Sequence, residues 1–465
     1  MLTGYFLNRI LIKDATINLW FGSYAVLILS ALSGTFIFIT LIAVLIAIYT
    51  RKKNVVTGTV FLALLPMLPT ELGVIIGGLG ISYIYTMYYP LLLVLCVLAP
   101  LLLNSHFRNI NLTDKFIIMY VVLLCVLSYR APNITSSIRD IFIIIFSVLV
   151  PYLSFSLSLR KKNDFESIAK GMVIVSVFLA AISFYEVVFN WNYYKYLFSR
   201  ELFSNAQNYY FAQSSRGAYV RVVSSIGAPI PLSYYLVLSL IFGYFLFSIN
   251  KMKKRSFYIY SSIIMLSIYF TGSRAGVMSV ALSAILLFRL SVKSRSKRYF
   301  IDAMIILGII IILVLWPYIS GGDEHGTFQY RVDLIKNSFI VFINSFWFGS
   351  NNYMDDLEVM RQGQGIIDIV NTYIRVALSS GMIGLSLFVL AFASVIRALN
   401  KIGVKNLFHE QQQAKILLVA CIVTVVFIGT VSSVGVIPYL FWSLLGIASA
   451  FIKLQAQQTT KNLHS

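Results

Sequence analysis

Several arginines lie in the polar segments that separate long apolar stretches of this sequence. They are Arg216, Arg221, Arg274, Arg331, Arg361 and Arg375. A guanidinium group is always charged, and its planar fork of N–H donors matches the oxygens of phosphate and carboxylate groups. Each of these arginines alone could simply contact lipid headgroups at a membrane interface. As a set, they predict that the protein binds an anionic ligand.

Arg274 lies in the tight turn Thr271-Gly272-Ser273-Arg274-Ala275-Gly276, between two short apolar stretches. A charge at or just beneath a membrane interface is costly and usually marks a functional site. Backbone N–H groups at the start of the following helix also favour a bound anion. The turn therefore predicts an anion-binding role for Arg274. The alternative is that Arg274 only ties the turn to nearby carbonyl groups.

Acidic side chains that could act as a general base are few in the polar segments. Asp368 precedes an apolar stretch that begins near residue 376, and Arg375 follows it closely. A carboxylate at the entrance of a membrane span can take the proton of a sugar hydroxyl. It can equally form an ion pair that holds Arg375 or Arg331. Glu186 and Asp333 are weaker candidates for the same two roles.

The elements that must position these residues are membrane-spanning helices. Of the 465 residues, 59% are hydrophobic and 12% are charged. A soluble domain cannot bury so much apolar surface, because one core stops growing at about 250–300 residues. In a bilayer, a span needs about 20 mostly apolar residues. The composition predicts an all-α, polytopic transmembrane helix bundle of about 12 spans, forming a single transmembrane domain over residues 1–465.

Lysine and arginine cluster in short connectors between the apolar stretches. These connectors are Arg51–Lys53, Arg160–Lys162, Lys251–Arg255, Lys293–Arg298 and Arg397–Lys405. The positive-inside rule places them in the cytoplasm. The net charge of +20 is thus explained by membrane topology, and no nucleic-acid partner is expected. Alternation then places residues 191–222, the turn 271–276 and residues 319–375 outside.

The two long outer segments are the soluble-looking parts of the chain. Residues 191–222 are aromatic and polar and are expected to form the smaller, first outer loop. Residues 319–375 form the larger loop, in which Tyr330 to Phe348 has apolar residues at helical spacing and should lie on the membrane surface. Between 55 and 104, Pro66, Pro69 and Gly77-Gly78 predict a broken or re-entrant segment.

Metal and cofactor sites are not expected from this sequence. Cys96, Cys125 and Cys421 all lie inside apolar stretches, where cysteine usually serves as a small packing residue. The four histidines are scattered along the chain and form no ligand cluster. No phosphate-binding loop typical of ATP-dependent enzymes is present. We therefore expect neither a bound metal nor a cofactor.

The order of motifs resembles a known family. Arg221 precedes a helix interrupted near Gly227 and Pro229, TGSRAG follows, and the outer segment with Arg331 leads to Asn371-Thr372-Tyr373 and Ser379–Leu385. Over residues 210–395 this order resembles the O-antigen ligase and O-antigen polymerase (Wzy-type) superfamily of bacterial envelope enzymes. The resemblance implies a glycosyltransferase C-like fold in the inner membrane, with an active site that faces the periplasm and acts on undecaprenyl-pyrophosphate-linked sugars.

The resemblance also implies roles for the residues singled out above. By that analogy Arg221, Arg274 and Arg331 would hold the pyrophosphate and stabilise its developing charge as it leaves, and a nearby base would take the proton of the acceptor hydroxyl. Together with the argument from the residues themselves, we expect Arg274 and Asp368 to be catalytic. The residues expected to bind the pyrophosphate or the glycan are Arg216, Arg221, Arg274, Arg331, Arg375, Asn371 and Tyr373. The expected partners are an undecaprenyl-pyrophosphate-linked oligosaccharide, membrane lipid and a chain-length regulator protein.

One departure from the family pattern separates the possible activities. Ligases of this superfamily typically carry a histidine just before the asparagine of the NxY-like motif, and Val370 stands there in this chain. This favours a polymerase of O-antigen, capsule or exopolysaccharide over a ligase that transfers glycan to lipid A core. A flippase for the lipid-linked oligosaccharide is a third possibility. Transporters usually show internal repeats with charges near the bilayer midplane, whereas the polar residues here gather in two outer segments.

Overall fold

The computed structural model describes most of the chain. The described residues are 54–68, 73–76, 85–103, 110–192, 215–216, 219–292, 294, 327–361, 367–405 and 408–464. Pro69, the Gly77-Gly78 pair, the connector Arg51–Lys53 and most of the expected first outer loop 191–222 lie outside them, as do the apolar stretches 24–49 and 300–318.

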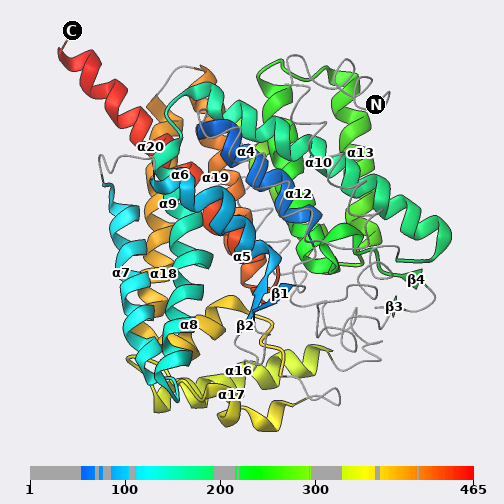
Figure 1. Cartoon of the computed structure of the whole chain (residues 1–465). Helices are drawn as coiled ribbons and strands as arrows, with labels where there is room; N and C mark the ends of the chain where they lie inside the picture. The colour runs from blue at the N-terminus through cyan, green and yellow to red at the C-terminus, as the bar shows by residue number, and fades with distance from the viewer. Residues whose placement is uncertain are drawn as a thin grey trace.

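Long helices make up most of the described chain (Figure 1). They are α7 (Leu112–Leu127), α8 (Ile134–Ile144), α9 (Val150–Ser158), α10 (Lys162–Phe189), α12 (Pro229–Ser248), α13 (Lys254–Phe270), α14 (Arg274–Ser291), α18 (Thr372–Lys405), α19 (Phe408–Ile428) and α20 (Ile437–His464). Within the described residues, 8 helical stretches are long and apolar enough to cross a membrane. The all-α polytopic fold is thus confirmed. The number of about 12 spans stays a prediction.

The predicted interruption between residues 55 and 104 is confirmed. Short helical segments, α4 (Asn54–Leu64) with η1 (Leu65–Met67) and α5 (Tyr89–Leu93) with η2 (Val94–Leu98) and α6 (Ala99–Leu103), flank a β-hairpin. Its strands β1 (Gly73–Ile76) and β2 (Tyr85–Tyr88) pair antiparallel, with Gly73 opposite Tyr88. Pro66 lies in η1, where its missing N–H ends the regular helical ladder.

Proline also explains why two of the helical segments are irregular. The π-helical turn η2 comes just before Pro100, and the π-helical turn η4 (Ile145–Leu149) joins α8 to α9 just before Pro151. A proline inside a helix cannot donate to the carbonyl of the preceding turn, and a widened turn absorbs the misfit. Residues 134–158 therefore continue as one apolar helical stretch despite Pro151.

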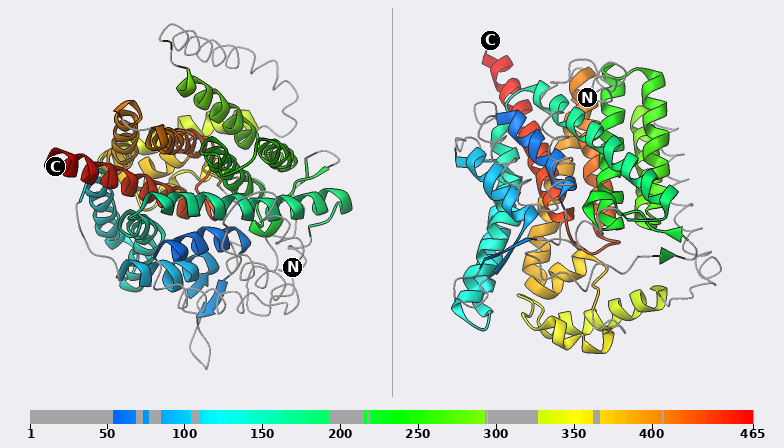
Figure 2. Two further views of the ribbon diagram at one scale, coloured as in Figure 1. Left: turned by 90° about the horizontal axis from the view of Figure 1, so that it is seen from above. Right: turned by 45° about the vertical axis from the view of Figure 1, so that its right-hand side comes forward.

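Those connectors rich in lysine and arginine that the structure describes lie at one end of the bundle. The connector between α12 and α13, the start of α10 and the end of α18 all lie there, and α16 (Thr327–Asn344) and α17 (Tyr353–Asp356) lie at the opposite end (Figures 1 and 2). We call these the basic end and the α16 end. The segregation agrees with the alternation predicted from the positive-inside rule.

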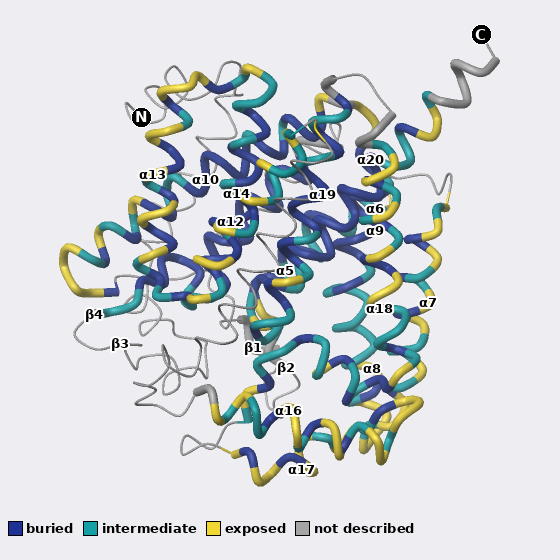
Figure 3. The backbone as a smooth tube through the Cα atoms, turned by 180° about the vertical axis from the view of Figure 1, so that it is seen from behind, coloured by how far each residue is buried: buried dark blue, intermediate teal, exposed yellow. Residues whose placement is uncertain are grey.

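Close packing and buried polar bonds hold the helices together (Figure 3). Tyr234 of α12 stacks on Phe427 of α19 with ring centroids 4.7 Å apart, and its hydroxyl forms a 2.9 Å hydrogen bond with Thr424 Oγ1. Nearer the basic end, Lys453 Nζ lies 2.8 Å from Asp114 Oδ2, and Tyr152 donates to the other oxygen of Asp114 at 2.6 Å. This network joins α7, α9 and α20. Because every charge in it is paired, its burial is tolerated.

The amphipathic stretch predicted from Tyr330 to Phe348 is helical over the bounds of α16. One face of α16 buries Leu334 and Val341 in a small core with residues from η7 (Glu358–Met360) and the start of α18. The opposite face exposes Ile335, Phe339, Ile340 and Ile343. An exposed apolar stripe of this kind is typical of a helix that lies on a membrane surface.

Candidate active site

Arg221 is held against the TGSRAG turn, far from it in sequence. Its Nε donates to the carbonyl oxygen of Thr271 at 2.9 Å, and the backbone N–H of Val222 donates to Phe270 O at 3.2 Å. Gly272 adopts a positive φ of +59° beside the Arg221 side chain, a conformation that favours glycine. The structure thus brings together two features that the sequence only placed in order along the chain.

A buried carboxylate positions the segment that carries Arg221. Glu186 of α10 is 1% exposed, and its Oε2 accepts hydrogen bonds from the backbone N–H groups of Val223 at 2.9 Å and Ser224 at 3.0 Å. These residues lead into the 3-10 turn η6 (Ser224–Ile226), where Ser224 has a φ of +50°. Charge-assisted bonds of this kind hold an otherwise strained turn. Glu186 is therefore a positioning residue in this structure.

Arg274 is the first residue of α14, and its side chain is exposed. Ser273 caps the helix by accepting from the N–H of Gly276, and its hydroxyl also accepts from Ser233 Oγ of α12 at 3.0 Å. A Cβ at Gly276 would lie 2.7 Å from Ser233 Cβ, so the turn packs tightly on α12. The cap satisfies one N–H group and leaves the positive end of the helix dipole beside Arg274.

Asp368 belongs to a second group of polar residues, at the α16 end. The Tyr330 hydroxyl donates to the carbonyl oxygen of Asp368 at 3.0 Å and accepts from its N–H at 3.1 Å. The Asp368 carboxylate accepts from Ser432 Oγ at 2.7 Å and is exposed. Ser432 lies in the loop between α19 and α20. This loop was missed at the sequence level, although its polar run Thr430–Ser433 separates the last two apolar stretches.

The remaining residues of the NxY motif are bound within the fold. Asn371 Oδ1 caps α18 by accepting from the N–H groups of Tyr373 at 2.8 Å and Ile374 at 3.2 Å, and the Tyr373 hydroxyl donates to Val425 O at 2.9 Å. Arg375 is exposed and its Nη1 lies 3.5 Å from Ser433 O. Asn371 and Tyr373 therefore position the start of α18, and Arg375 lies beside the loop that holds Asp368.

The SSGMIGL motif breaks α18. Gly381 has φ +66° and ψ −166°, outside the helical region. The segment before α17 fits into the break: Ser350 N–H donates to Leu378 O at 2.8 Å, and Met382 N–H donates to Phe346 O at 2.7 Å. Backbone groups freed by the break are thus satisfied by residues 346–350, as membrane-embedded backbone requires. A Cβ at Gly381 would collide with the carbonyl group of Trp347.

A polar cavity lies beside this break, between α7, α8, α17 and α18. Its volume is about 440 Å³, and Arg130, Asp140 and Arg375 contribute to its wall. Arg130 Nη1 donates to the carbonyl oxygens of Phe348 at 3.1 Å and Gly349 at 2.8 Å. Arg130 and Asp140 were missed at the sequence level. Alternation of the spans also places residues 130–140 outside, as it does the other arginines. The predicted topology could therefore have identified Arg130 and Asp140 as candidates.

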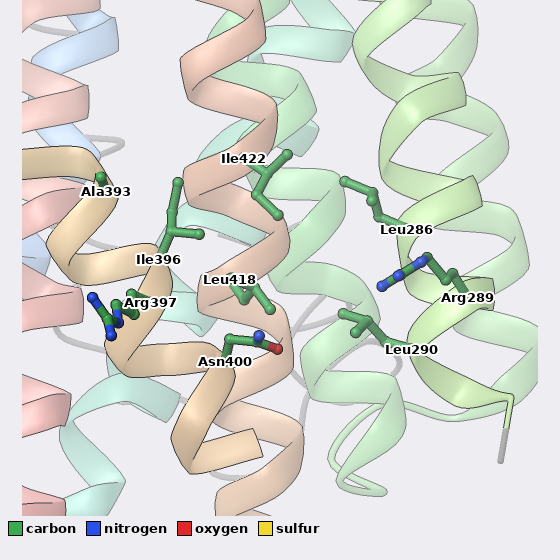
Figure 4. Close-up of a pocket in the computed structure, with 9 residues that line it drawn as sticks. All are labelled: Leu286, Arg289, Leu290, Ala393, Ile396, Arg397, Asn400, Leu418 and Ile422. Atoms are coloured by element: carbon green, nitrogen blue, oxygen red, sulfur yellow. The ribbon is translucent and has the colours of Figure 1, made fainter. Parts of the chain in front are cut away.

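A cavity of about 530 Å³ lies toward the C-terminal ends of α14 and α18 (Figure 4). Leucine and isoleucine side chains make up most of its wall, and Arg289 of α14 points toward it. Arginine beside apolar surface near a helix end is typical of contact with lipid headgroups. Because this cavity is near the basic end, we do not include it in the candidate active site.

Other predicted residues have local partners or incomplete descriptions. Arg331 is exposed on α16, and Asp333 accepts from Gln329 Nε2 at 2.9 Å. Arg361 donates to Glu358 at 2.5 and 2.6 Å, and this hydrogen bonding lowers the pKa of Glu358. Arg216 pairs with Tyr219 between the short strands β3 (Ser215–Arg216) and β4 (Tyr219–Val220), and its side chain is outside the described part.

Metal ligation finds no support in the parts of the chain that the structure covers. Among those residues, no group of three or more His, Cys, Asp or Glu side chains could hold a metal ion. The polar side chains described above are mainly guanidinium and hydroxyl groups. Exposed guanidinium groups beside a helix N-terminus can bind a phosphate, and an exposed carboxylate can accept a proton.

Residues 259–389 match the family model described as Wzy_C, O-Antigen ligase. The match includes the turn with Arg274, helix α16 with Arg331, and the segment with Asp368 and Arg375. Arg221 lies outside it, on the N-terminal side of α12. No curated protein matches the chain. The family model confirms, over these residues, the resemblance to the O-antigen ligase and polymerase superfamily, whose members are glycosyltransferase-like enzymes that act on lipid-linked glycans in polysaccharide assembly.

Proposed function

We propose that this protein is a polymerase of lipid-linked oligosaccharide repeat units in the bacterial inner membrane, with an active site that faces the periplasm. A glycan would move from undecaprenyl pyrophosphate to the next lipid-linked unit. The observation that carries the proposal is the turn 271–276, which Arg221 holds by its Thr271 carbonyl and which presents Arg274 at the start of α14. This is a site for a leaving pyrophosphate.

The chemistry follows from the charges of that turn. As the bond between the anomeric carbon and the pyrophosphate oxygen breaks, negative charge grows on the leaving group. Arg274 and the N-terminal N–H groups of α14 would stabilise that charge, and because the turn is already fixed, little reorganisation is needed. The energy of the reaction is stored in the sugar–pyrophosphate bond, so no nucleotide is required.

Asp368 would be the general base. The acceptor hydroxyl oxygen attacks the anomeric carbon as its proton passes to the Asp368 carboxylate, and undecaprenyl pyrophosphate leaves with the electron pair of the broken bond. Ser432 orients the carboxylate, and the Tyr330 hydroxyl bonds to both the N–H and the carbonyl oxygen of Asp368. The ion-pair alternative for Asp368 is not favoured, because its described partner is a serine hydroxyl.

A ligase that transfers glycan to lipid A core is the second candidate. The match to a family model described as O-Antigen ligase supports it. Val370 stands against it, since it occupies the position where ligases of this superfamily typically carry a histidine. We therefore favour the polymerase.

A cell-free assay tests the proposal. Purified protein in detergent is given undecaprenyl-pyrophosphate-linked repeat units as the sole substrate, and the products are separated on a gel. We expect a ladder spaced by one repeat unit. Arg274→Ala should slow its formation by about 100-fold or more, the usual cost of removing a transition-state charge donor. Arg255→Ala, at the basic end, is the matched control and should keep the wild-type rate.

Two results would contradict the proposal. A wild-type rate in the Arg274→Ala protein would remove the turn from the active site. Absence of a ladder with wild-type protein, together with product when lipid A core is added, would identify the protein as a ligase.

A further inference from the structure

The polar cavity between α7, α8, α17 and α18 has the size of a ligand site. Its volume of about 440 Å³ falls in the range of roughly 300–1,000 Å³ that is typical of such sites. The polar groups that line it come from Arg130, Asp140, Asn351, Tyr353, Arg375 and Ser379. Apolar side chains of α7 and α8 complete the wall. A cavity lined by both polar and apolar side chains, beside the break in α18, is suited to an amphiphilic ligand.

Charge distinguishes this cavity from the turn that carries Arg274. Two guanidinium groups share the cavity with the carboxylate of Asp140, which is half-buried and forms no ion pair within the described residues. Asp140 offsets part of that positive charge, which makes the cavity less favourable for a pyrophosphate than two arginines alone would be. Sugar hydroxyls, in contrast, both donate and accept, so they can donate to Asp140 and accept from the arginines. The ring of Tyr353 offers a face on which a pyranose can stack.

Contacts outside the cavity hold its polar groups in place. Arg130 is bound to the carbonyl oxygens of Phe348 and Gly349, and Asn351 Nδ2 donates to Arg130 O at 3.3 Å. Residues 346–350 are in turn fixed in the break of α18. A site whose groups are fixed before binding loses less entropy when the ligand arrives.

Arg375 connects the cavity to the proposed general base. It lines the cavity and contacts Ser433 O, and the neighbouring Ser432 donates to the Asp368 carboxylate. Arg375 and the loop 430–433 thus link the cavity wall to Asp368.

We propose that this cavity binds the distal sugars of the acceptor repeat unit and presents an acceptor hydroxyl to Asp368. The inference rests on the proposed polymerase function and assigns its second substrate site. Arg130 and Asp140 are the new binding residues. The turn 271–276 would then serve the leaving pyrophosphate, so donor and acceptor have separate sites.

Equilibrium binding tests the inference without requiring turnover. The probe is the repeat-unit oligosaccharide released by hydrolysis from the polysaccharide of the source strain, titrated calorimetrically into the full-length protein in detergent. Asp140→Asn, which keeps the shape of the side chain, should weaken binding about tenfold or more through loss of a charge-assisted hydrogen bond. Arg130→Gln is a second variant with the same expectation. Asp356→Asn, an exposed residue of α17 outside the cavity wall, is the matched control.

Several outcomes would overturn the inference. One is that both Asp140→Asn and Arg130→Gln bind the oligosaccharide with wild-type affinity. Another is that the wild-type protein does not bind the oligosaccharide. A third is that inorganic pyrophosphate displaces the bound oligosaccharide. The last result would assign the cavity to the leaving group. A ladder from a wild-type protein that does not bind the oligosaccharide would refute the acceptor site and keep the polymerase. Binding that depends on Asp140, without a ladder from the wild-type protein, would keep the glycan site and refute the polymerase.

Discussion

Arg221 combines two roles that a lysine cannot fill together. Its Nε donates to the Thr271 carbonyl, and its side chain lies against Gly272 of the turn that carries Arg274. A lysine ammonium is a single charged point, so it can hold the carbonyl or approach the pyrophosphate. We expect Arg221→Lys to lower the rate of ladder formation about tenfold or more at saturating substrate, because the defect lies in stabilising the leaving group. Initial rates from the cell-free assay measure this.

The matched control for Arg221→Lys is Arg255→Lys, the same exchange at the basic end, which should leave the rate unchanged. Arg221 and Arg274 act on one turn, so their losses should not add. The double variant Arg221→Lys/Arg274→Ala is expected to be little slower than Arg274→Ala alone. Fully additive losses would show that the two arginines act independently and would separate Arg221 from the turn.

Gly381 and Gly349 let two backbone segments approach more closely than other residues allow. A Cβ at either glycine would collide with backbone of the other segment, and both have positive φ. The backbone strain alone in Gly381→Ala costs about 1–3 kcal/mol, before any collision is counted. We expect a clearly lower thermal unfolding temperature and loss of polymer, because the break in α18 supports both the cavity and Arg375.

Val389→Ala serves as the control for Gly381→Ala, since Val389 is an exposed residue of α18 beyond the break. Its unfolding temperature and polymer yield should stay near those of the wild-type protein. If Gly381→Ala behaved the same way, α18 would not need its break, and the positioning of residues 346–350 against it would lose its importance.

Elements that depend on local sequence could be predicted, and contacts between distant segments could not. Apolar stretches of about 20 residues predict spans, and apolar residues at helical spacing predicted the helix that α16 forms. The turn 271–276 could also be located, because charges and glycines interrupt apolar sequence there. The positions of Ser432 beside Asp368 and of Arg130 beside Phe348 depend on pairs far apart in the chain. No periodicity in a single sequence reports such pairs.

The described basic connectors lie at one end of the molecule and the candidate site lies toward the other. The orientation of the protein in the membrane can therefore be tested by labelling each end. After the native cysteines are replaced by alanine, Asp356→Cys and Lys401→Cys put a thiol at exposed positions of α17 and of the far end of α18. Lys401 lies in a basic connector, so we expect it in the cytoplasm. A membrane-impermeant maleimide should label Asp356→Cys in cells whose outer membrane is permeabilised. It should label Lys401→Cys only after the cells are lysed. Labelling of Lys401→Cys in intact spheroplasts would reverse the topology, and the pyrophosphate site would then face the wrong compartment for a periplasmic polymerase.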